Sequence, residues 1–172
     1  SEALMLCVSC LCFIALSKKA WLWAGILAAV GTACRPNGIA LVLACAVAAL
    51  LAIKEDRDWK ALIAPALSPL GFIGFMAFLM HHTDENFAWF RVQTEAWKEG
   101  TSFGATAVSR TFDFFLNPTS SPTTVLTAAS MAAMILALWC LRKYRIPAMY
   151  TAYTAGVLIL MLLPATVTAR PR

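Results

Sequence analysis

Apolar residues in this chain occur in long continuous runs separated by short polar breaks. The run at 61–80 has 20 residues, which as a helix is long enough to cross a bilayer core of about 30 Å, even with two prolines inside it. The pattern predicts an all-α fold, a polytopic transmembrane helix bundle of which residues 1–172 form one part. The six predicted membrane segments are 3–16, 20–34, 39–53, 61–80, 124–141 and 148–163.

A four-residue break, Arg35-Pro36-Asn37-Gly38, separates the second and third runs. Each of these two runs has 15 apolar or small residues, about 22 Å as a helix. They are bounded at their other ends by Lys19 and Lys54, so Arg35 is expected at or just inside the opposite membrane surface. Pro36 suits the first position of the next helix, whose N–H groups and positive dipole end would favour an anion. The alternative is a tight turn in which Arg35 reaches lipid phosphates.

Composition supports a membrane protein, since 60% of residues are hydrophobic, 13% are charged and the mean hydropathy is +0.72. The net charge of +5 could suggest nucleic acid in a soluble protein, but its location argues against that partner. If the segments alternate, loops 17–19, 54–60 and 142–146 share one side with a net charge of +5, and the other side sums to 0. The positive-inside rule makes the first side cytoplasmic, so Glu2, Arg35 and an external loop at 81–123 face outward.

The order of capping, aromatic and polar residues in the external loop predicts interfacial helices. Thr83 suits the N-cap of a helix that Gly100 could close, along which aromatic and polar residues alternate. A second helix is predicted at about 105–116, ended by Asn117-Pro118, with Arg110 among apolar residues. The alternative is a pair of surface helices that shield the bundle.

The sequence contains no pattern typical of a metal or cofactor site. The six cysteines lie in or beside apolar runs and none lies in the 81–123 loop, which argues against a disulfide framework. His81 and His82 are adjacent, so on a helix they project about 100° apart and could not easily share a metal. A Gly-rich phosphate loop is also absent. We therefore predict neither metal nor cofactor.

Four short motifs together resemble the PIG-V family of membrane mannosyltransferases, whose eukaryotic members are GPI mannosyltransferase 2. The motifs are Ser1-Glu2-Ala3-Leu4, Ala33-Cys34-Arg35-Pro36-Asn37-Gly38, Gln93-x-x-x-Trp97 and Ala169-Arg170-Pro171-Arg172. Members of this family look like GT-C glycosyltransferases, many-helix proteins that take a sugar from a polyprenyl phosphate on the outer or lumenal side. The resemblance implies mannose transfer to a lipid or glycan acceptor, in a bacterial plasma membrane or, in a eukaryote, the endoplasmic reticulum.

The resemblance also suggests roles for particular residues. It places Arg35, Asn37, Arg170 and Arg172 at the donor phosphate, and Gln93, Trp97 and Arg110 in a loop that contacts donor or acceptor. The family's catalytic acid lies in an external loop that would precede Ser1. We therefore interpret the chain as an internal fragment that is inactive alone, in which Glu2 supports catalysis beside Arg35. Such roles suit the chemistry, since sugar transfer from a lipid phosphate needs cations for the departing phosphate. The alternative is that Glu2 is an interfacial carboxylate in water.

Two other classes of function stay open. A secondary transporter or flippase for an anionic lipid or metabolite could use the same break, because half-helices meeting at an arginine form anion sites in transporters. Against that class, the break is expected near one membrane face and no inverted repeat is visible. A non-catalytic membrane subunit is the third alternative.

Overall fold

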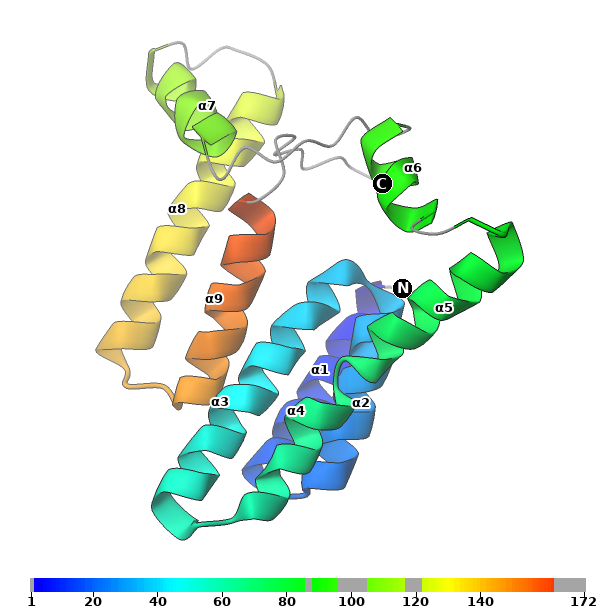
Figure 1. Cartoon of the computed structure of the whole chain (residues 1–172). Coiled ribbons are helices and arrows are strands. Elements are labelled where there is room, and N and C mark those ends of the chain that lie inside the picture. Colours follow the sequence, from blue (N-terminus) through cyan, green and yellow to red (C-terminus); the bar gives the residue numbers. More distant parts are fainter. Residues whose placement is uncertain (1, 86–87, 96–104, 117–121, 163–172) are drawn as a thin grey trace. The chain divides into compact units, whose positions relative to one another are not determined.

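The computed structural model describes residues 2–85, 88–95, 105–116 and 122–162, and every regular element within them is a helix (Figure 1). The all-α prediction is therefore confirmed for this part of the chain. The α-helices are α1 (Glu2–Ser17), α2 (Trp21–Cys34), α3 (Ile39–Asp56), α4 (Ile63–Leu67), α5 (Leu70–Thr83), α6 (Ala88–Glu95), α7 (Ala105–Leu116), α8 (Pro122–Lys143) and α9 (Ala148–Leu162). Two 3₁₀ helices, η1 (Pro36–Gly38) and η2 (Trp59–Leu62), precede α3 and α4.

Each of the six predicted membrane segments coincides with helical structure over its described residues. In the part of the chain that the structure describes, three helical stretches are long and apolar enough to cross a membrane: Pro36–Asp56, Trp59–Thr83 and Thr124–Lys143. Shorter apolar helices occupy Glu2–Ser17, Trp21–Cys34 and Ala148–Leu160. The protein is thus a membrane helical bundle, and all six of its cysteines are free thiols.

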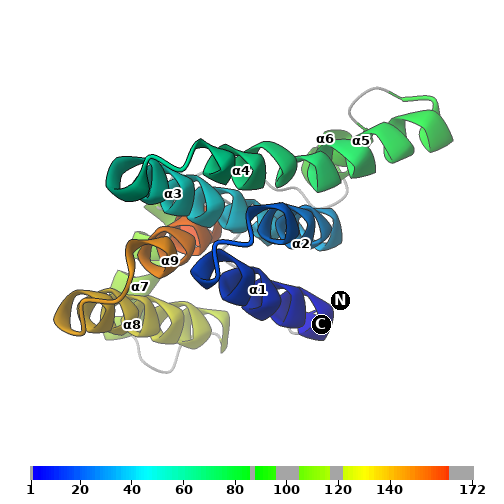
Figure 2. The same cartoon turned by 90° about the horizontal axis from the view of Figure 1, so that it is seen from below.

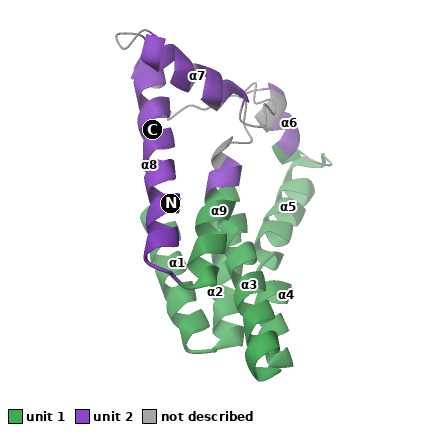
Figure 3. Cartoon of the chain, turned by 90° about the vertical axis from the view of Figure 1, so that its left-hand side faces the viewer, with its two compact units in different colours: residues 1–89, 147–157 green, residues 90–146, 158–172 purple. Residues whose placement is uncertain are grey.

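The chain forms two compact units (Figure 3). The first comprises residues 1–89 and 147–157, and the second comprises residues 90–146 and 158–172. In the first unit α2 lies between α1 on one side and α4 and α5 on the other (Figure 2). Small residues allow this central position: Ala24 and Ala28 are fully buried, and a Cβ on Gly25 would come within 2.9 Å of the Leu67 Cβ.

The break between α4 and α5 is tied to α2 by side-chain hydroxyls. Pro69 has no N–H to donate to the Pro65 carbonyl oxygen, and the Ser68 hydroxyl donates to that oxygen instead, at 3.1 Å. The Thr32 hydroxyl of α2 lies between two carbonyl oxygens, 2.8 Å from that of Ala29 in its own helix and 2.9 Å from that of Ser68, and shares its one proton between them. Just beyond the break Gly71 crosses α2 so closely that a Cβ there would collide with the carbonyl oxygen of Ala29. The prolines therefore bend this span without leaving these carbonyl oxygens unpaired.

The prediction that Thr83 caps the start of an external helix is wrong. Thr83 is the last residue of α5, and its hydroxyl donates back to the Leu79 carbonyl oxygen at 2.8 Å. Asp84 follows in the left-handed conformation, with φ 51°, and ends the helix. The hydroxyl bonds within its own helix because α5 continues through His81 and His82 rather than ending at the apolar run. The next helix, α6, begins at Ala88.

The helix predicted at about 105–116 is confirmed, since α7 spans Ala105–Leu116. In the second unit α7 packs against α8. Gly100 and Asn117-Pro118, predicted to end the two external helices, lie outside the described residues.

Candidate functional site

The break between α2 and α3 places Arg35 beside Glu2. Glu2 begins α1 and Arg35 follows the last residue of α2, so the antiparallel packing of the two helices brings these residues to the same end of the first unit. The Arg35 Nη1 donates to the Glu2 Oε1 at 2.9 Å. The expected contact between the two side chains is therefore present.

The backbone of the break holds Arg35 in a defined position. Arg35 is extended, with φ −157° and ψ 148°, and its N–H donates to the Gly31 carbonyl oxygen at 3.3 Å. Pro36 then starts η1, and the Gly38 N–H closes that turn on the Arg35 carbonyl oxygen at 2.9 Å. Pro36 therefore begins a helix as predicted, with one 3₁₀ turn before α3. A Cβ on Gly38 would collide with the Gly31 carbonyl oxygen, so only glycine allows this close approach to α2.

The Arg35 guanidinium is fixed by its bond to Glu2 and is still accessible to a ligand. The Arg35 side chain is 37% exposed and the Glu2 side chain 78% exposed. A guanidinium has five N–H donors in a planar fork, so it can keep its bond to a carboxylate and still bind a phosphate oxygen. Asn37, the neighbouring predicted site residue, is also exposed, on η1. The arrangement can therefore receive an anion beside a fixed cation.

The remaining predicted site residues are not brought to this pair by the described structure. Trp97, Arg170 and Arg172 lie outside the described residues. Gln93 belongs to α6 and Arg110 to α7, and their side chains are likewise outside what is described. Within the described part of the chain, no group of three or more His, Cys, Asp and Glu could hold a metal ion.

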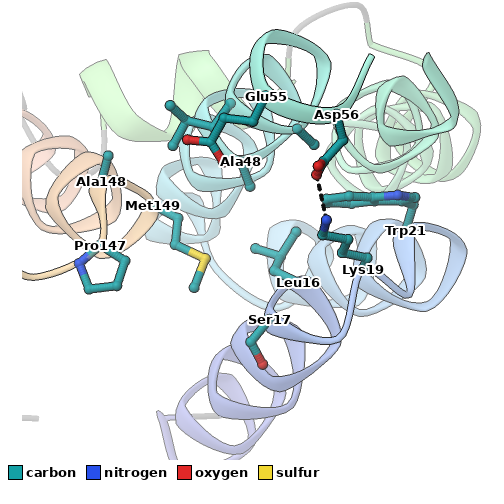
Figure 4. Close-up of a pocket in the computed structure, with 12 residues that line it drawn as sticks. Leu16, Ser17, Lys19, Trp21, Ala48, Glu55, Asp56, Pro147, Ala148 and Met149 are labelled. Carbon is teal, nitrogen blue, oxygen red and sulfur yellow. Dashed lines mark hydrogen bonds and ion pairs between the residues drawn. The ribbon is translucent and has the colours of Figure 1, made fainter. Parts of the chain in front are cut away.

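The other end of the first unit carries a polar cluster that the sequence reasoning did not single out (Figure 4). The Lys19 ammonium pairs with Asp56, which raises the pKa of Lys19, and the Trp21 indole N–H donates to Asp58 at 2.7 Å. A hollow of about 160 Å³ beside them is also lined by Met149 of α9. The end of α1, the start of α2, the end of α3 and the start of α9 therefore meet here, as the predicted alternation of segments requires. The sequence contained a signal for this ion pair, since Lys19 precedes α2 and Asp56 ends the antiparallel helix α3, and the two residues carry opposite charges.

An apolar helical bundle with an accessible arginine at a helix break defines a membrane protein that can handle an anionic ligand. The comparison with protein families identifies its chemistry, because residues 1–166 match glycosyltransferase family 87. The chain belongs to this family and is a membrane glycosyltransferase. No curated protein and no solved structure shows a significant match to it. The family match bears out the glycosyltransferase part of the predicted function and does not extend to the PIG-V family.

Proposed function

We propose that this glycosyltransferase moves mannose from a polyprenyl-phosphate donor to a lipid or glycan acceptor on the outer or lumenal side of the membrane. The observation that carries the proposal is the ion pair of Arg35 with Glu2 at the α2–α3 break. Three long apolar helices supply the bilayer setting that a lipid-linked donor needs. The assignment of mannose as the sugar is based on the resemblance of the motifs around Arg35 to mannosyltransferases. The proposed location in a bacterial plasma membrane or the endoplasmic reticulum has the same basis.

Arg35 stabilises the departing phosphate in this reaction. When the bond between sugar and phosphate breaks, negative charge develops on the polyprenyl phosphate, and a preorganised guanidinium lowers the energy of that state. Asn37, exposed two residues further on, adds an amide donor for a phosphate oxygen. In the same proposal Arg170 and Arg172 add further positive charge.

Glu2 is a positioning residue rather than the base. Its carboxylate accepts from one nitrogen of the guanidinium and so fixes the direction of the fork. The acceptor hydroxyl gives its proton to the carboxylate of the acidic residue that the resemblance places in a preceding external loop. Gln93, Trp97 and Arg110 belong to the proposed loop that contacts donor or acceptor. The transporter alternative is disfavoured by the membership of a glycosyltransferase family and by a break that lies at the end of the first unit.

The test is an assay of membranes that contain the protein, with labelled polyprenyl-phosphate mannose and polyprenyl-phosphate glucose as parallel donors. Arg35→Ala should abolish transfer while the protein still inserts, because an exposed ion pair contributes only about 0–1 kcal/mol to stability. Arg35→Lys should rescue transfer in part, since a point charge does not reproduce the fork. Glu2→Gln should lower turnover and leave donor binding intact. Near-normal turnover of Arg35→Ala would show that the phosphate role is wrong.

Lys19→Ala is the matched control, since it removes a cation from an exposed ion pair at the other end of the same unit. This variant should transfer sugar at the wild-type rate. Equal losses in Lys19→Ala and Arg35→Ala would indicate a general loss of folding instead of a loss of phosphate binding. Preferential use of the glucose donor would be consistent with a glycosyltransferase and would refute the assignment of mannose as the transferred sugar.

A further inference from the structure

Helix α7 carries a contiguous apolar face that stays exposed. Four large apolar residues with helical spacing i, i+4, i+7 and i+8 lie on one side of the helix. Their exposed fractions are 46% for Val108, 66% for Phe112, 73% for Phe115 and 76% for Leu116. Four such side chains in one row form a patch that a helix surrounded by water on this face would not be expected to display.

The opposite side of α7 is fixed to α8. Phe114, which lies roughly opposite the row by helical spacing, and Thr111 on the flank of the row are half-buried. At the beginning of α8 the residues on one side by helical spacing are buried, with Thr124 at 8%, Thr127 at 2% and Ala128 at 9% exposure, and α7 packs against α8. Both helices belong to the second unit, and Figure 1 shows α7 beside the first turns of α8. The apolar row of α7 therefore points away from the helix that holds it.

The surface below α7 on the same side of α8 is also apolar and exposed. Ile135 lies 7 positions after Ala128 and Leu138 lies 11 after Thr127, spacings that return to the same side of a helix. Ile135 is 64% exposed and Leu138 44% exposed. These residues belong to the stretch Thr124–Lys143, which is long and apolar enough to cross the membrane. The exposed row on α7 is thus continuous with the side of a membrane-crossing helix.

The borders of the apolar row indicate the kind of partner. Ser109 and Asp113 are exposed and lie next to Leu116 and Phe112 around the helix. An exposed apolar face with aromatic side chains, bordered by exposed polar side chains, is what a helix lying at the boundary between lipid and water presents. A protein partner that covered the whole face would have to bury the Asp113 carboxylate.

We propose that the row Val108, Phe112, Phe115 and Leu116 inserts into the bilayer interface at the end of α8 where α7 lies. The acyl chains of phospholipids cover the four side chains, and Asp113 stays in water. Helix α7 then anchors the beginning of α8 at a fixed depth. This inference is independent of the proposed donor and acceptor.

Photocrosslinking in membranes tests the inference, with p-benzoylphenylalanine in place of Phe112 or Phe115 and, as the matched control, in place of Asp113. All three positions are exposed on one helix, and only Asp113 lies outside the apolar row. After illumination, mass spectrometry of the α7 peptide should show phospholipid adducts at positions 112 and 115, in several-fold excess over position 113.

Three outcomes would overturn the inference. Crosslinks from positions 112 and 115 to peptides of the first unit would show that this unit covers the row, and crosslinks between two copies of α7 would show a dimer interface. Equal lipid labelling at 112 and 113 would mean that α7 is not oriented by its apolar row. Photocrosslinking at single exposed positions leaves the packing against α8 unchanged, so loss of folding is not expected to obscure the result.

Discussion

Replacing Gly38 by alanine tests whether the close approach of η1 to α2 fixes the arginine site. The added Cβ would meet the Gly31 carbonyl oxygen and would lie 2.7 Å from the Thr32 Cα, whereas ordinary contacts begin at 3.4 Å. The turn must therefore move from α2 by roughly 0.7 Å or more, because backbone atoms block the methyl group and no flexible side chain can yield. Overpacking of this kind costs about 1–3 kcal/mol.

Gly74→Ala is the matched control for stability. Gly74 lies within α5, and a Cβ there meets nothing within 4 Å. The substitution should leave the protein as stable or stabilise it by about 0.5–1 kcal/mol, because alanine loses less conformational freedom in a helix. In thermal unfolding of the detergent-solubilised protein, Gly38→Ala should therefore melt below wild type and Gly74→Ala at or above it. Equal melting temperatures for the two variants would refute the steric argument.

Gly71→Ala separates stability from function. A Cβ on Gly71 would collide with the Ala29 carbonyl oxygen, so this variant should also melt below wild type. The collision is with Ala29 and the Thr32 hydroxyl at the contact of α5 with α2, and not with the Gly31 carbonyl group that the turn carrying Arg35 lies against. At a temperature where both variants are folded, Gly38→Ala should lose sugar transfer and Gly71→Ala should keep most of it. Similar transfer by both would show that the position of η1 does not matter for the reaction.

Three further predictions concern other parts of the molecule. Thr32→Val should lower thermal stability by about 1 kcal/mol and Thr32→Ser should not, because the buried hydroxyl donates to the carbonyl oxygen at the α4–α5 break. Asp56 raises the pKa of Lys19, so the ion pair's contribution is complete below the ordinary lysine pKa of about 10.4 and is lost only as pH rises through the raised value. The melting temperature difference between wild type and Lys19→Ala should accordingly be the same at pH 6 and pH 9, and a difference that changes within this range would contradict the assignment. An impermeant maleimide outside intact cells should label a cysteine replacing Asp113 and not one replacing Glu55, and the reverse labelling would invert the proposed orientation.

The sequence alone determined the helical class and the position of the membrane segments. In a bilayer every backbone polar group has to be paired within the segment, so a long apolar run specifies a helix without reference to the rest of the chain. The 105–116 helix and the start of a helix at Pro36 could also be predicted from local residues, because Asn117-Pro118 ends a helix and proline suits its first position. The prediction at Thr83 was wrong because helix ends depend on which of several bonds a hydroxyl makes, and that choice depends on how far the preceding helix extends.

The tertiary structure decided how closely the helices approach one another. The contact of Glu2 with Arg35, 33 positions apart, could be predicted because the run lengths place both residues at one membrane surface, whereas the sequence does not indicate the contact of Thr32 with Ser68, 36 positions apart. Both depend on how closely α2 approaches its neighbours, which Gly31, Gly38 and Gly71 permit by the absence of a side chain. Residue type established that Arg35 could bind an anion. The packing of glycine against backbone established where the guanidinium is held, because the distance between two helices is set by the smallest residues at their contact.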